Sequence, residues 1–438
     1  ITKYWPSLLR ACATNLVRSR KPMLKRKLSL LSTAAVISLG ASLALPLSSA
    51  QAEDVTLKLV MASYTDDMLP YYTDLITRFE AANAGIKVDL DVVAWPEIGQ
   101  KVKTLIASGQ SPDIVNNDEF AGEAADGLLY PASKIVSAAT LKDIIPAFRD
   151  NSKYNGVEYA VPDLASARAF FYNKTILKGA GVAKPPATWT ELKAAAIKIK
   201  AKYPDVYPIG LPLGVEEGQA EFTVWGGGNG GRLYNEKTKK YTIDTKEYLE
   251  TLTFLKGLVD SKLTQPNPGK TNRTDGAWSL FAKGKVAMVN GGVFLPDWLS
   301  KNGGEKIKWG ASAFPHAPGK TDITLGVQDY FKGYKANGRE TEIRKFLDFI
   351  FVPANYAGFL KAAGGFIPAT KSAGKLAESD PIIGPYIKLL PKAIFYPGTV
   401  GSWSACKADI VTQMGTAMLD PKKALTNIQK KCDAANAG

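Results

Sequence analysis

The stretch from residue 155 to residue 192 constrains the fold most, because it holds a turn, two apolar runs and a helix start in close succession. It opens with Asn155-Gly156, a pair that favours a tight turn. Residues 157–161 then predict a strand that Pro162 ends, and residues 169–172 form a second apolar run. A strand leaving one sheet and a strand entering another, with a polar stretch between them, predict a chain crossing between two lobes.

The rest of the chain alternates between the apolar spacing of strands and that of helices. Residues 55–61 and 85–90 predict strands, and residues 69–79 between them predict a helix. After the crossing, Thr188 and Glu191 have the spacing of a capping box, so a helix is expected directly behind them. This alternation predicts an α/β fold in which mixed, largely parallel sheets are flanked by helices.

The second half of the chain continues the same pattern. Residues 226–231, five glycines and one asparagine, predict a flexible loop, because a nucleotide site would need an adjoining strand, helix and acidic residue. Further elements are expected as a strand at 286–289, a second crossing at 325–334, and helices at about 406–418 and 421–432.

The first 52 residues have the pattern of a secretory signal peptide. Met23 begins a short basic segment, residues 28–45 are apolar, and Ala50-Gln51-Ala52 is an A-x-A cleavage site. We therefore expect residues 23–52 to be removed after Ala52 and the mature protein to be periplasmic, with residues 1–22 as upstream sequence. A membrane anchor is the alternative, since the apolar run is nearly long enough to span a bilayer.

The charge and histidine content argue against several classes of function. The full chain carries an excess of +14, which falls to +6 for residues 53–438 once the eight basic residues before them are removed. The densest basic cluster, Lys237 to Lys240, is expected in a hairpin turn, so nucleic-acid binding is not expected. His316 is the only histidine, which argues against a His/Cys zinc site. A nucleophile–histidine centre could rest only on this residue.

Two cysteines remain after the presequence, Cys406 and Cys432. An even number in an oxidising compartment favours a disulfide between them. Such a bridge would close a loop of about 26 residues and contribute about 3 kcal/mol in the loop-entropy account. Two free buried thiols are the alternative.

Polar or aromatic residues follow several of the expected strands. Ser63-Tyr64 follow the first strand, residues 116–119 follow a short buried strand, and Asn290-Gly291 follow residues 286–289. In open α/β sheets, ligands bind beyond the carboxyl ends of strands. Because these residues fall in both expected lobes, we expect them to face a common cleft.

Several motifs occur in a fixed order along residues 55–435. They are Gly109-x-x-Pro-Asp113-Ile, Asn173-Lys174, the Pro-Pro-x-Thr-Trp-x-Glu-Leu of residues 185–192, Phe281-x-x-Gly-x-x-Ala-Met288 with Asn290-Gly291, Gly365-x-x-Pro368, and Ser402-Trp403. Together they resemble the periplasmic sugar-binding proteins of ABC importers, a family of solute-binding proteins that includes maltose-binding protein.

The resemblance implies a type II periplasmic-binding-protein fold with two lobes joined by a hinge of several crossings. Lobe 1 would comprise residues 54–164 and 325–378, and lobe 2 residues 165–324 and 379–438. It implies a monomer without enzymatic activity or cofactor, which closes on a monosaccharide, oligosaccharide or polyol and delivers it to membrane permease subunits. Alternatives are an anion, sugar phosphate or metal as ligand, or a secreted glycoside hydrolase that would need a second carboxylate such as Glu221.

The resemblance also assigns ligand contacts residue by residue. Asp118 falls where the family places a carboxylate that accepts sugar hydroxyls, Trp403 falls at a sugar-stacking aromatic, and Trp225 falls near another stacking region. The alternatives are a helix cap for Asp118 and core positions for both tryptophans. The other expected ligand-binding residues are Ser63, Tyr64, Asn290, Gly291, Phe294, Asp329 and Tyr330.

Some residues near these positions have other expected roles. The family often has tryptophan directly after the Asn-Gly-x motif, whereas this chain has Val293 and then Phe294. Arg168, in the crossing, is either one half of a structural ion pair or a ligand contact. Glu216 and Glu217 are predicted to lie on the surface.

Overall fold

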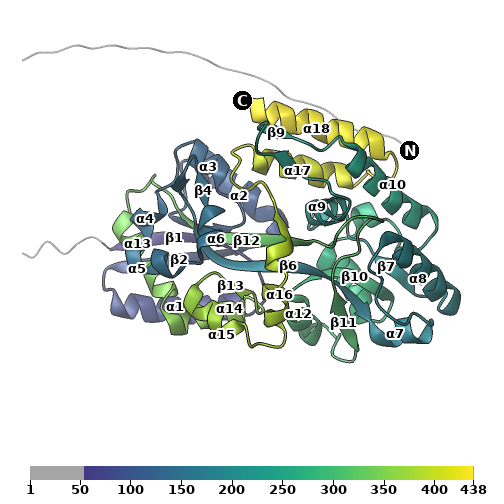
Figure 1. Cartoon of the computed structure of the whole chain (residues 1–438). Coiled ribbons are helices and arrows are strands. Elements are labelled where there is room, and N and C mark those ends of the chain that lie inside the picture. The colour runs from purple at the N-terminus through teal and green to yellow at the C-terminus, as the bar shows by residue number, and fades with distance from the viewer. Residues whose placement is uncertain (1–53, 438) are drawn as a thin grey trace, which may run out of the picture. The chain divides into compact units, whose positions relative to one another are not determined.

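The computed structural model describes residues 54–437 (Figure 1). The expected signal peptide and the residues before it therefore lie outside the described range. Among the helices of residues 54–437, none combines the length and apolar character needed to cross a bilayer.

A mixed sheet runs through the molecule, and its main path has the strand order β2-β1-β3-β12-β6-β10-β7. β1 is parallel to β2 and β3, β10 is parallel to β7, and the antiparallel strands β12 and β6 lie between these two groups. The bounds are β2 Ile86–Val93, β1 Val55–Ala62, β3 Ile114–Asn117, β12 Thr324–Gly333, β6 Val161–Asn173, β10 Val286–Gly292 and β7 Tyr207–Gly210. The predicted α/β class with mixed sheets is confirmed.

Short strands extend this path or form separate hairpins. β11 (Trp309–Ser312) and β13 (Ile367–Pro368) pair with β6, and β14 (Ala393–Phe395) pairs with β12. β4 (Lys153–Tyr154) and β5 (Val157–Glu158) form a hairpin across the predicted turn at Asn155-Gly156, where both residues have positive φ. β8 (Tyr234–Asn235) and β9 (Lys240–Tyr241) form the second predicted hairpin, with the lysine cluster at its turn.

The prediction of two strands separated at Pro162 is wrong. β6 is one strand of 13 residues, and it contains Pro162. It pairs with β12 as far as Ala167 and with β10 from Arg168 onwards. The β12 register shifts between Asp329 and Tyr330, which face Leu164 and Pro162. A proline lacks the N–H that a regular ladder needs, and a bulge is one of the places where a strand tolerates it. The crossing is thus a continuous strand.

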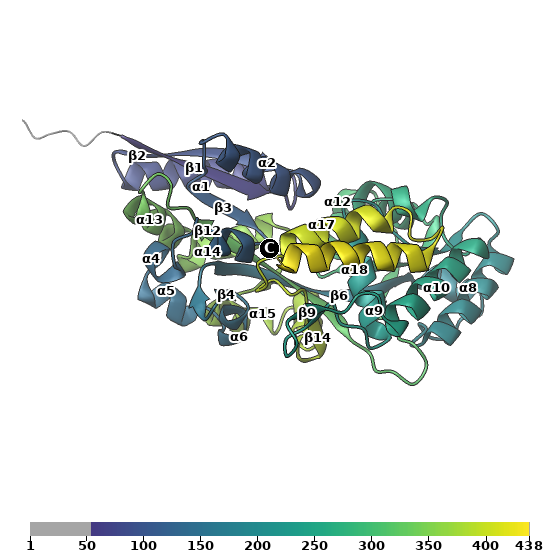
Figure 2. The same ribbon diagram turned by 90° about the horizontal axis from the view of Figure 1, so that it is seen from above.

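Helices flank the sheet at both of its ends, as Figures 1 and 2 show. Around the β1–β2 end the helices are α1 Met68–Ala82, α2 Trp95–Ala107, α3 Ala121–Ala125, α4 Ala132–Ile135, α5 Ala138–Asp143, α6 Pro146–Asp150, α13 Glu340–Ile350, α14 Pro353–Ala362 and α15 Lys371–Ala377. Helix α16, Ile383–Ile387, lies beside β6 and β13 in the middle of the molecule. The remaining helices are α7 Lys174–Gly179, α8 Trp189–Lys202, α9 Gly218–Gly228, α10 Lys246–Asp260, α11 Ser279–Ala282, α12 Leu295–Lys301, α17 Trp403–Met414 and α18 Pro421–Ala437, with the short turns η1 Pro268–Lys270 and η3 Leu390–Lys392 and the π-helix η2 Arg273–Trp278.

The predicted helix starts depend on side-chain caps that the structure contains. Thr188 and Glu191 form the expected capping box at α8, with each side chain bonded to the backbone of the other residue. At α18, Pro421 takes the first position and Asp420 accepts a hydrogen bond from the Lys423 backbone N–H at 3.0 Å. Local chemistry therefore fixes where both helices begin.

The predicted loop at residues 226–231 is wrong for its first half, because α9 continues to Gly228. A Cβ added at Gly226 would lie only 2.1 Å from Tyr248 Cε1, and one at Gly227 only 2.3 Å from Ile394 Cδ1. The glycines therefore let α9 pack closely against its neighbours, which is a packing requirement rather than a signal for flexibility.

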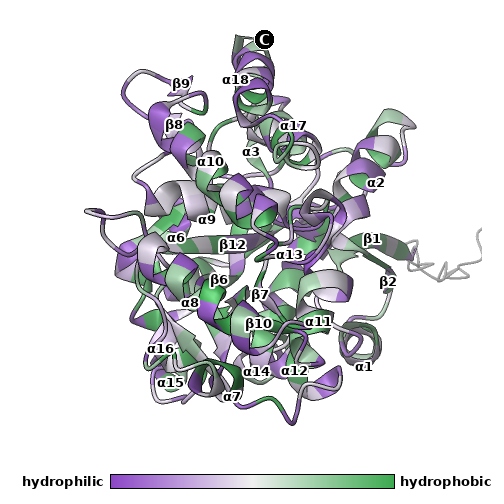
Figure 3. Ribbon diagram, turned by 90° about the vertical axis from the view of Figure 1, so that its right-hand side faces the viewer, coloured by the Kyte–Doolittle hydropathy of each residue, from purple (hydrophilic) through white to green (hydrophobic). Residues whose placement is uncertain are grey.

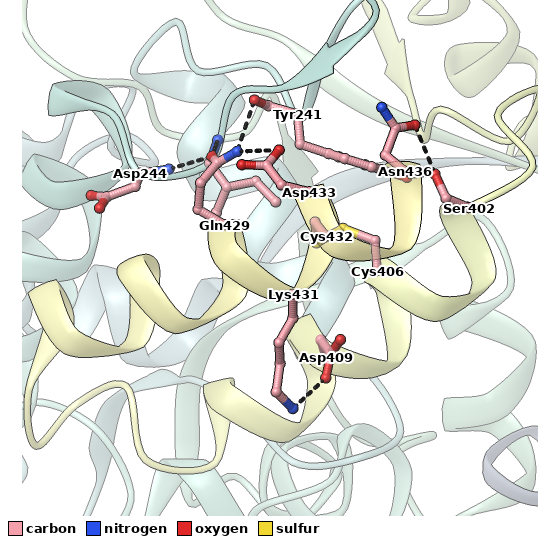
Figure 4. The surroundings of a disulfide bond; sticks show 11 residues. Tyr241, Asp244, Ser402, Cys406, Asp409, Gln429, Lys431, Cys432, Asp433 and Asn436 are labelled. Carbon is pink, nitrogen blue, oxygen red and sulfur yellow. Dashed lines mark hydrogen bonds and ion pairs between the residues drawn. A yellow bond between two sulfur atoms is a disulfide. The ribbon is translucent and has the colours of Figure 1, made fainter. Parts of the chain in front are cut away.

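Cys406 and Cys432 are joined by a disulfide that links α17 to α18 (Figure 4). The pair of helices is also held by Lys431–Asp409 at 2.7 Å, and Gln429 bonds the chain around Tyr241 and Asp244. Both cysteines are fully buried. The predicted pairing is confirmed, and it ties the last helix of the described chain to the rest of the fold.

Removing this bridge should destabilise the protein. The double variant Cys406→Ser/Cys432→Ser should lose about 3 kcal/mol of unfolding free energy in urea, because the unfolded chain regains the freedom of a 26-residue loop. Reduced wild-type protein is the matched control and should show a similar loss. Unfolding midpoints that coincide for oxidised, reduced and variant protein would contradict a stabilising role.

Candidate functional site

A cavity of about 440 Å³ lies among segments that are far apart in the sequence. This volume is within the range of about 300–1,000 Å³ that is typical of small-molecule sites. The segments that line it are the turn after β1, the start of α2, the residues after β3, the middle of β6 and β12, the turn before α9, η2, the start of α12, and α17. Several of these follow directly on the carboxyl ends of strands, where ligands collect in open α/β sheets.

Aromatic rings form one part of the cavity wall. Phe294 stacks on Phe366 at a centroid distance of 4.7 Å, and Tyr64 meets Phe366 edge-on at 5.3 Å. Trp95 packs edge-on against Tyr64 at 5.4 Å. Trp298 packs edge-on against Trp278 at 5.5 Å. Because Trp95 and Trp298 are only half buried, their rings keep apolar surface available to a ligand.

A buried ion network forms another part of the wall. Arg168 donates from Nη2 to Glu217 Oε1 at 2.6 Å, and Arg273 donates from Nη1 to Glu217 Oε2 at 2.8 Å. Glu216 pairs with Arg273 at 3.0 Å and also accepts hydrogen bonds from the backbone N–H and the hydroxyl of Thr274. Burial alone would lower the pKa of Arg273, but Glu217 and Glu216 outweigh it and raise that pKa. Arg273 is therefore charged, and carboxylates hold both arginines in place.

The ion network also positions an aromatic ring. The guanidinium carbons of Arg168 and Arg273 each lie 5.3 Å from the centre of the Phe294 ring, and that of Arg273 lies 4.8 Å from the Trp278 ring. Such cation–π contacts favour a fixed ring orientation. The Nε atoms of both arginines are buried without a hydrogen-bond partner within the described residues.

A second ion cluster lies where α17 faces the segment after β3. Lys407 Nζ is 2.6 Å from Asp118 Oδ2 and 3.1 Å from Glu119 Oε1. Burial alone would raise the pKa of Glu119, but Lys407 and a hydrogen bond from Ser404 outweigh it and hold the pKa at about 2. Asp118 is therefore an ion-pair partner at the cavity wall, not a helix cap, since no side-chain cap bond is made at α3.

Asp329 lines the cavity and has one carboxyl oxygen without a partner within the described residues. Tyr64 donates its hydroxyl to Asp329 Oδ2 at 2.9 Å, while Asp329 Oδ1 is buried and has no partner within the described residues. Burial first, and then the negative charge of Asp118, raise the pKa of Asp329 to about 7. Asp163, in β6, is also fully buried and accepts a hydrogen bond from Asn116 at 2.6 Å, and burial together with Asp329 raises its pKa. The middle of the crossing strands thus carries two carboxyl groups that favour the neutral form.

The structure brings four of the predicted ligand-binding residues to the cavity wall. These are Tyr64, Asp118, Phe294 and Asp329, which come from four different elements. Ser63 is beside the cavity but does not line it, and its backbone N–H extends the β1–β2 pairing to Val93. Arg168, left open between two roles by the sequence, both forms an ion pair and lines the cavity.

The other predicted residues lie behind the wall. Trp225 is buried among aromatic rings such as Phe314, and its indole N–H donates to Glu221 at 2.8 Å. Trp403 is buried and stacks at 5.2 Å on Tyr396, which does line the cavity. Tyr330, Asn290 and Gly291 are buried as well; Tyr330 donates to the Asn151 carbonyl, and Asn290 donates to Glu221. Their assignment as ligand contacts stays a prediction.

The prediction that Glu216 and Glu217 lie on the surface is wrong. Glu217 is only 3% exposed, because two arginines from β6 and η2 converge on it. The sequence did not reveal this, since the three partners are about 50 residues apart. Trp95 and Trp298 were not predicted to line the cavity. Trp95 could have been, because it closely follows the end of β2, just as Ser63-Tyr64 follow the end of β1.

Within residues 54–437, no three His, Cys, Asp or Glu side chains are grouped so that they could hold a metal ion. Three carboxylates of the cavity, Glu216, Glu217 and Asp118, instead face arginine and lysine side chains. The chemistry that the wall can offer is therefore hydrogen bonding and stacking, with fixed charges that largely neutralise one another.

Comparisons with known proteins agree with this architecture. Residues 62–357 match the family described as bacterial extracellular solute-binding protein. A Brucella abortus (strain 2308) protein named as a binding protein is 30% identical over 397 residues, covering 88% of this chain and 94% of its own length. The multiple sugar-binding protein of Streptococcus mutans is 28% identical over 288 residues, covering 63% of this chain and 66% of its own.

A solved structure shows the same fold. It is an ABC transporter solute-binding protein from Thermotoga lettingae, bound with α-D-tagatose, and it superposes with a TM-score of 0.77 at 19% sequence identity. The match covers 87% of this chain and 100% of the other. The predicted periplasmic-binding-protein fold of the type II class is confirmed.

Asp329 should make stability depend on pH. Its pKa of about 7 in the folded protein exceeds the value of about 3.9 for an exposed aspartate, so this group's contribution is fully present below about pH 4 and is lost as pH rises through about 7. Asp329→Asn, which keeps a neutral side chain at every pH, should flatten the fall of urea-unfolding free energy between about pH 4 and pH 7. Asp74→Asn, at an exposed carboxylate of α1, is the control. An Asp329→Asn slope as steep as that of the control would refute the buried neutral carboxyl.

Proposed function

The chain belongs to the bacterial extracellular solute-binding proteins, and from this premise we propose that it captures a carbohydrate in the cavity and delivers it to the permease of an ABC importer. The proposal covers monosaccharides, oligosaccharides and polyols. The names of the relatives support this class, since one is a multiple sugar-binding protein and another a diacetylchitobiose-binding protein.

One observation carries the proposal: half-buried aromatic rings and buried hydrogen-bonding groups share the same cavity. The C–H faces of a sugar ring are apolar and stack on aromatic rings, while its hydroxyl groups need donors and acceptors in fixed positions. Trp95 and Trp298 offer the rings. Asp329, Gln219 and the two arginines bring polar side chains to the same wall.

The charges of the cavity favour a neutral ligand. Arg168 and Arg273 already face Glu217 and Glu216, and Lys407 faces Asp118 and Glu119. An anionic ligand would have to compete with these carboxylates, and breaking a buried ion pair costs about 3–5 kcal/mol. A hydroxyl group can bond to polar side chains of the wall, such as Thr65 and Ser404, without breaking any pair. We therefore favour uncharged sugars and polyols over sugar phosphates or sugar acids.

Closure of two lobes around the ligand is the proposed mechanism. We assign the lobes as residues 54–164 with 325–378 and residues 165–324 with 379–438. Two ion pairs join these segments at the cavity and near it: Lys407 with Asp118 at 2.6 Å, and Lys301 with Asp67 at 2.6 Å. β6 and β12 pass between the segments and provide the hinge. Closure would order these ion pairs over the bound sugar.

The proposal describes a carrier without catalytic activity. Glycoside hydrolysis needs two carboxyl groups that face the scissile bond, one of them able to donate a proton. Glu221, the candidate second carboxylate, is 1% exposed and already accepts hydrogen bonds from Asn290 and Trp225. Membership of an extracellular family supports action outside the cytoplasmic membrane. We propose that export follows cleavage behind Ala52 and that the released protein is a monomer.

The two half-buried tryptophans of the cavity should carry binding energy. A thermal-shift screen across sugars and polyols would identify the ligand, and calorimetry would then measure its affinity. Trp298→Ala should weaken binding by about 2–4 kcal/mol, or about 30- to 800-fold, because the ring would be lost as a stacking surface. The unfolding free energy of Trp298→Ala should change much less than its binding free energy, since the ring is only half buried.

Trp403→Ala is the matched control for this experiment. Trp403 is 2% exposed, so its loss should leave a void and cost about 3–5 kcal/mol of unfolding free energy. Affinity should fall less than in Trp298→Ala, because Trp403 reaches the cavity only through Tyr396. If Trp403→Ala abolishes binding at normal stability while Trp298→Ala binds normally, the ligand does not lie against the proposed wall.

A further inference from the structure

Eight lysines gather at the end of the molecule that lies beyond the amino ends of β7 and β10. We call this surface the basic pole and define it by Lys174, Lys178, Lys200, Lys202, Lys283, Lys285, Lys306 and Lys308. Seven of the eight side chains are exposed, and Lys200 is half-buried. In Figure 3 the molecule is turned so that the end carrying α7 and α8 faces the viewer.

Backbone contacts bring these lysines together from four separate segments. The Lys174 N–H donates to the Lys308 carbonyl at 2.8 Å, and the Tyr207 N–H donates to the Lys285 carbonyl at 2.9 Å. Lys200 Nζ lies 5.4 Å from the centre of the Tyr207 ring. The arrangement is fixed by strand ends and helix ends, so the lysines share one face of the folded protein.

Two close contacts complete this ring of segments. A Cβ added at Gly284 would lie 3.9 Å from Ile307 Cδ1, which places Lys283 and Lys285 next to Lys306 and Lys308. A Cβ added at Gly179 would overlap the Tyr203 hydroxyl, which places Lys178 beside Lys202.

The basic pole holds nearly all the net charge of the described chain. Its four segments, residues 174–178, 200–205, 283–285 and 305–308, contain the eight lysines and two carboxylates, Asp205 and Glu305, which leaves six positive charges in excess. Residues 54–437 as a whole carry +7, because the excess of +14 loses eight basic residues and one acidic residue that precede Asp54. Within residues 54–437, none of the eight lysines forms an ion pair, whereas many other lysines do. The rest of the surface is therefore nearly balanced.

The pole is separate from the ligand cavity. β10 begins just after Lys285 at the pole and ends at Gly292, next to the cavity residue Phe294. Seven residues of extended strand span roughly 23 Å. A partner bound at the pole would leave the cavity free.

We propose that the basic pole docks the protein on an anionic lipid surface. Positive charges within a Debye length of such a surface are attracted by about 1 kcal/mol each. The pole contains lysines and no arginine, and flexible ammonium groups suit a diffuse layer of headgroups better than the fixed bidentate contacts of a protein partner.

The pole also carries the amphipathic residues that membrane–water interfaces favour. Tyr203, Tyr207 and Trp309 are half-buried there, and such rings prefer the headgroup level of a bilayer. A hollow of about 300 Å³ adjoins the pole at Lys200, and it is lined in part by Ile197, which is 53% exposed. Docking would hold the binding protein close to the membrane in which a permease resides.

Vesicle binding tests this proposal. The secreted protein should cosediment with vesicles of phosphatidylcholine containing about one third phosphatidylglycerol, and salt should release it. The double variant Lys306→Gln/Lys308→Gln should bind about 30-fold more weakly, since each lost charge removes about fivefold. Both lysines are exposed, so the thermal midpoint of the variant should match that of the wild type.

The matched control removes the same charge elsewhere. Lys237→Gln/Lys240→Gln, at the β8–β9 hairpin, should bind the anionic vesicles within about twofold of the wild type. Equal losses of vesicle affinity in the two variants would show that binding depends only on the net charge of the protein. That result would overturn the proposal that the basic pole is the docking surface. Failure to bind protein-free anionic vesicles, with binding only when a permease is present, would overturn the lipid proposal in favour of a protein partner. None of these outcomes depends on the identity of the cavity ligand.

Discussion

The buried contact of Glu217 with two arginines is the interaction on which the site depends. Arg168 comes from the crossing strand β6, Arg273 from the π-helix η2, and Glu217 from the turn before α9. Removing one member would leave a buried charge unpaired, at a cost of about 3–5 kcal/mol. The same arginines hold Phe294 by cation–π contacts, so the polar and aromatic parts of the wall are fixed together.

The fixed wall explains how one cavity can suit uncharged, hydroxyl-rich ligands. Donors and acceptors that are already oriented lose little freedom on binding, which leaves more of the interaction energy for affinity. Asp329 adds to this, because its raised pKa keeps a buried carboxyl able to donate as well as accept near neutral pH. The basic pole, at the other end of β10, adds a surface that works independently of the cavity.

Sequence reasoning succeeded where local chemistry decides the structure and failed where distant residues do. The capping box at Thr188, the turn at Asn155 and the cysteine pair could be predicted from neighbouring residues or from parity. Pro162 was misjudged because the register shift that accommodates it arises only when β6 pairs with β12, and Glu217 was misjudged because its partners lie on other elements. Composition likewise could not distinguish the half-buried Trp298 from the core residue Trp403.

A double-mutant cycle between Arg168 and Glu217 tests the central claim most directly. Urea unfolding of Arg168→Met, Glu217→Gln and the double variant gives the coupling free energy between the two side chains. We predict that each single variant loses about 3–5 kcal/mol, and that the double variant loses about 2–3 kcal/mol less than the sum, because the Arg273–Glu216 pair then remains as a neutral unit. Losses that simply add would contradict the account, since the two side chains would then contribute to stability independently of each other.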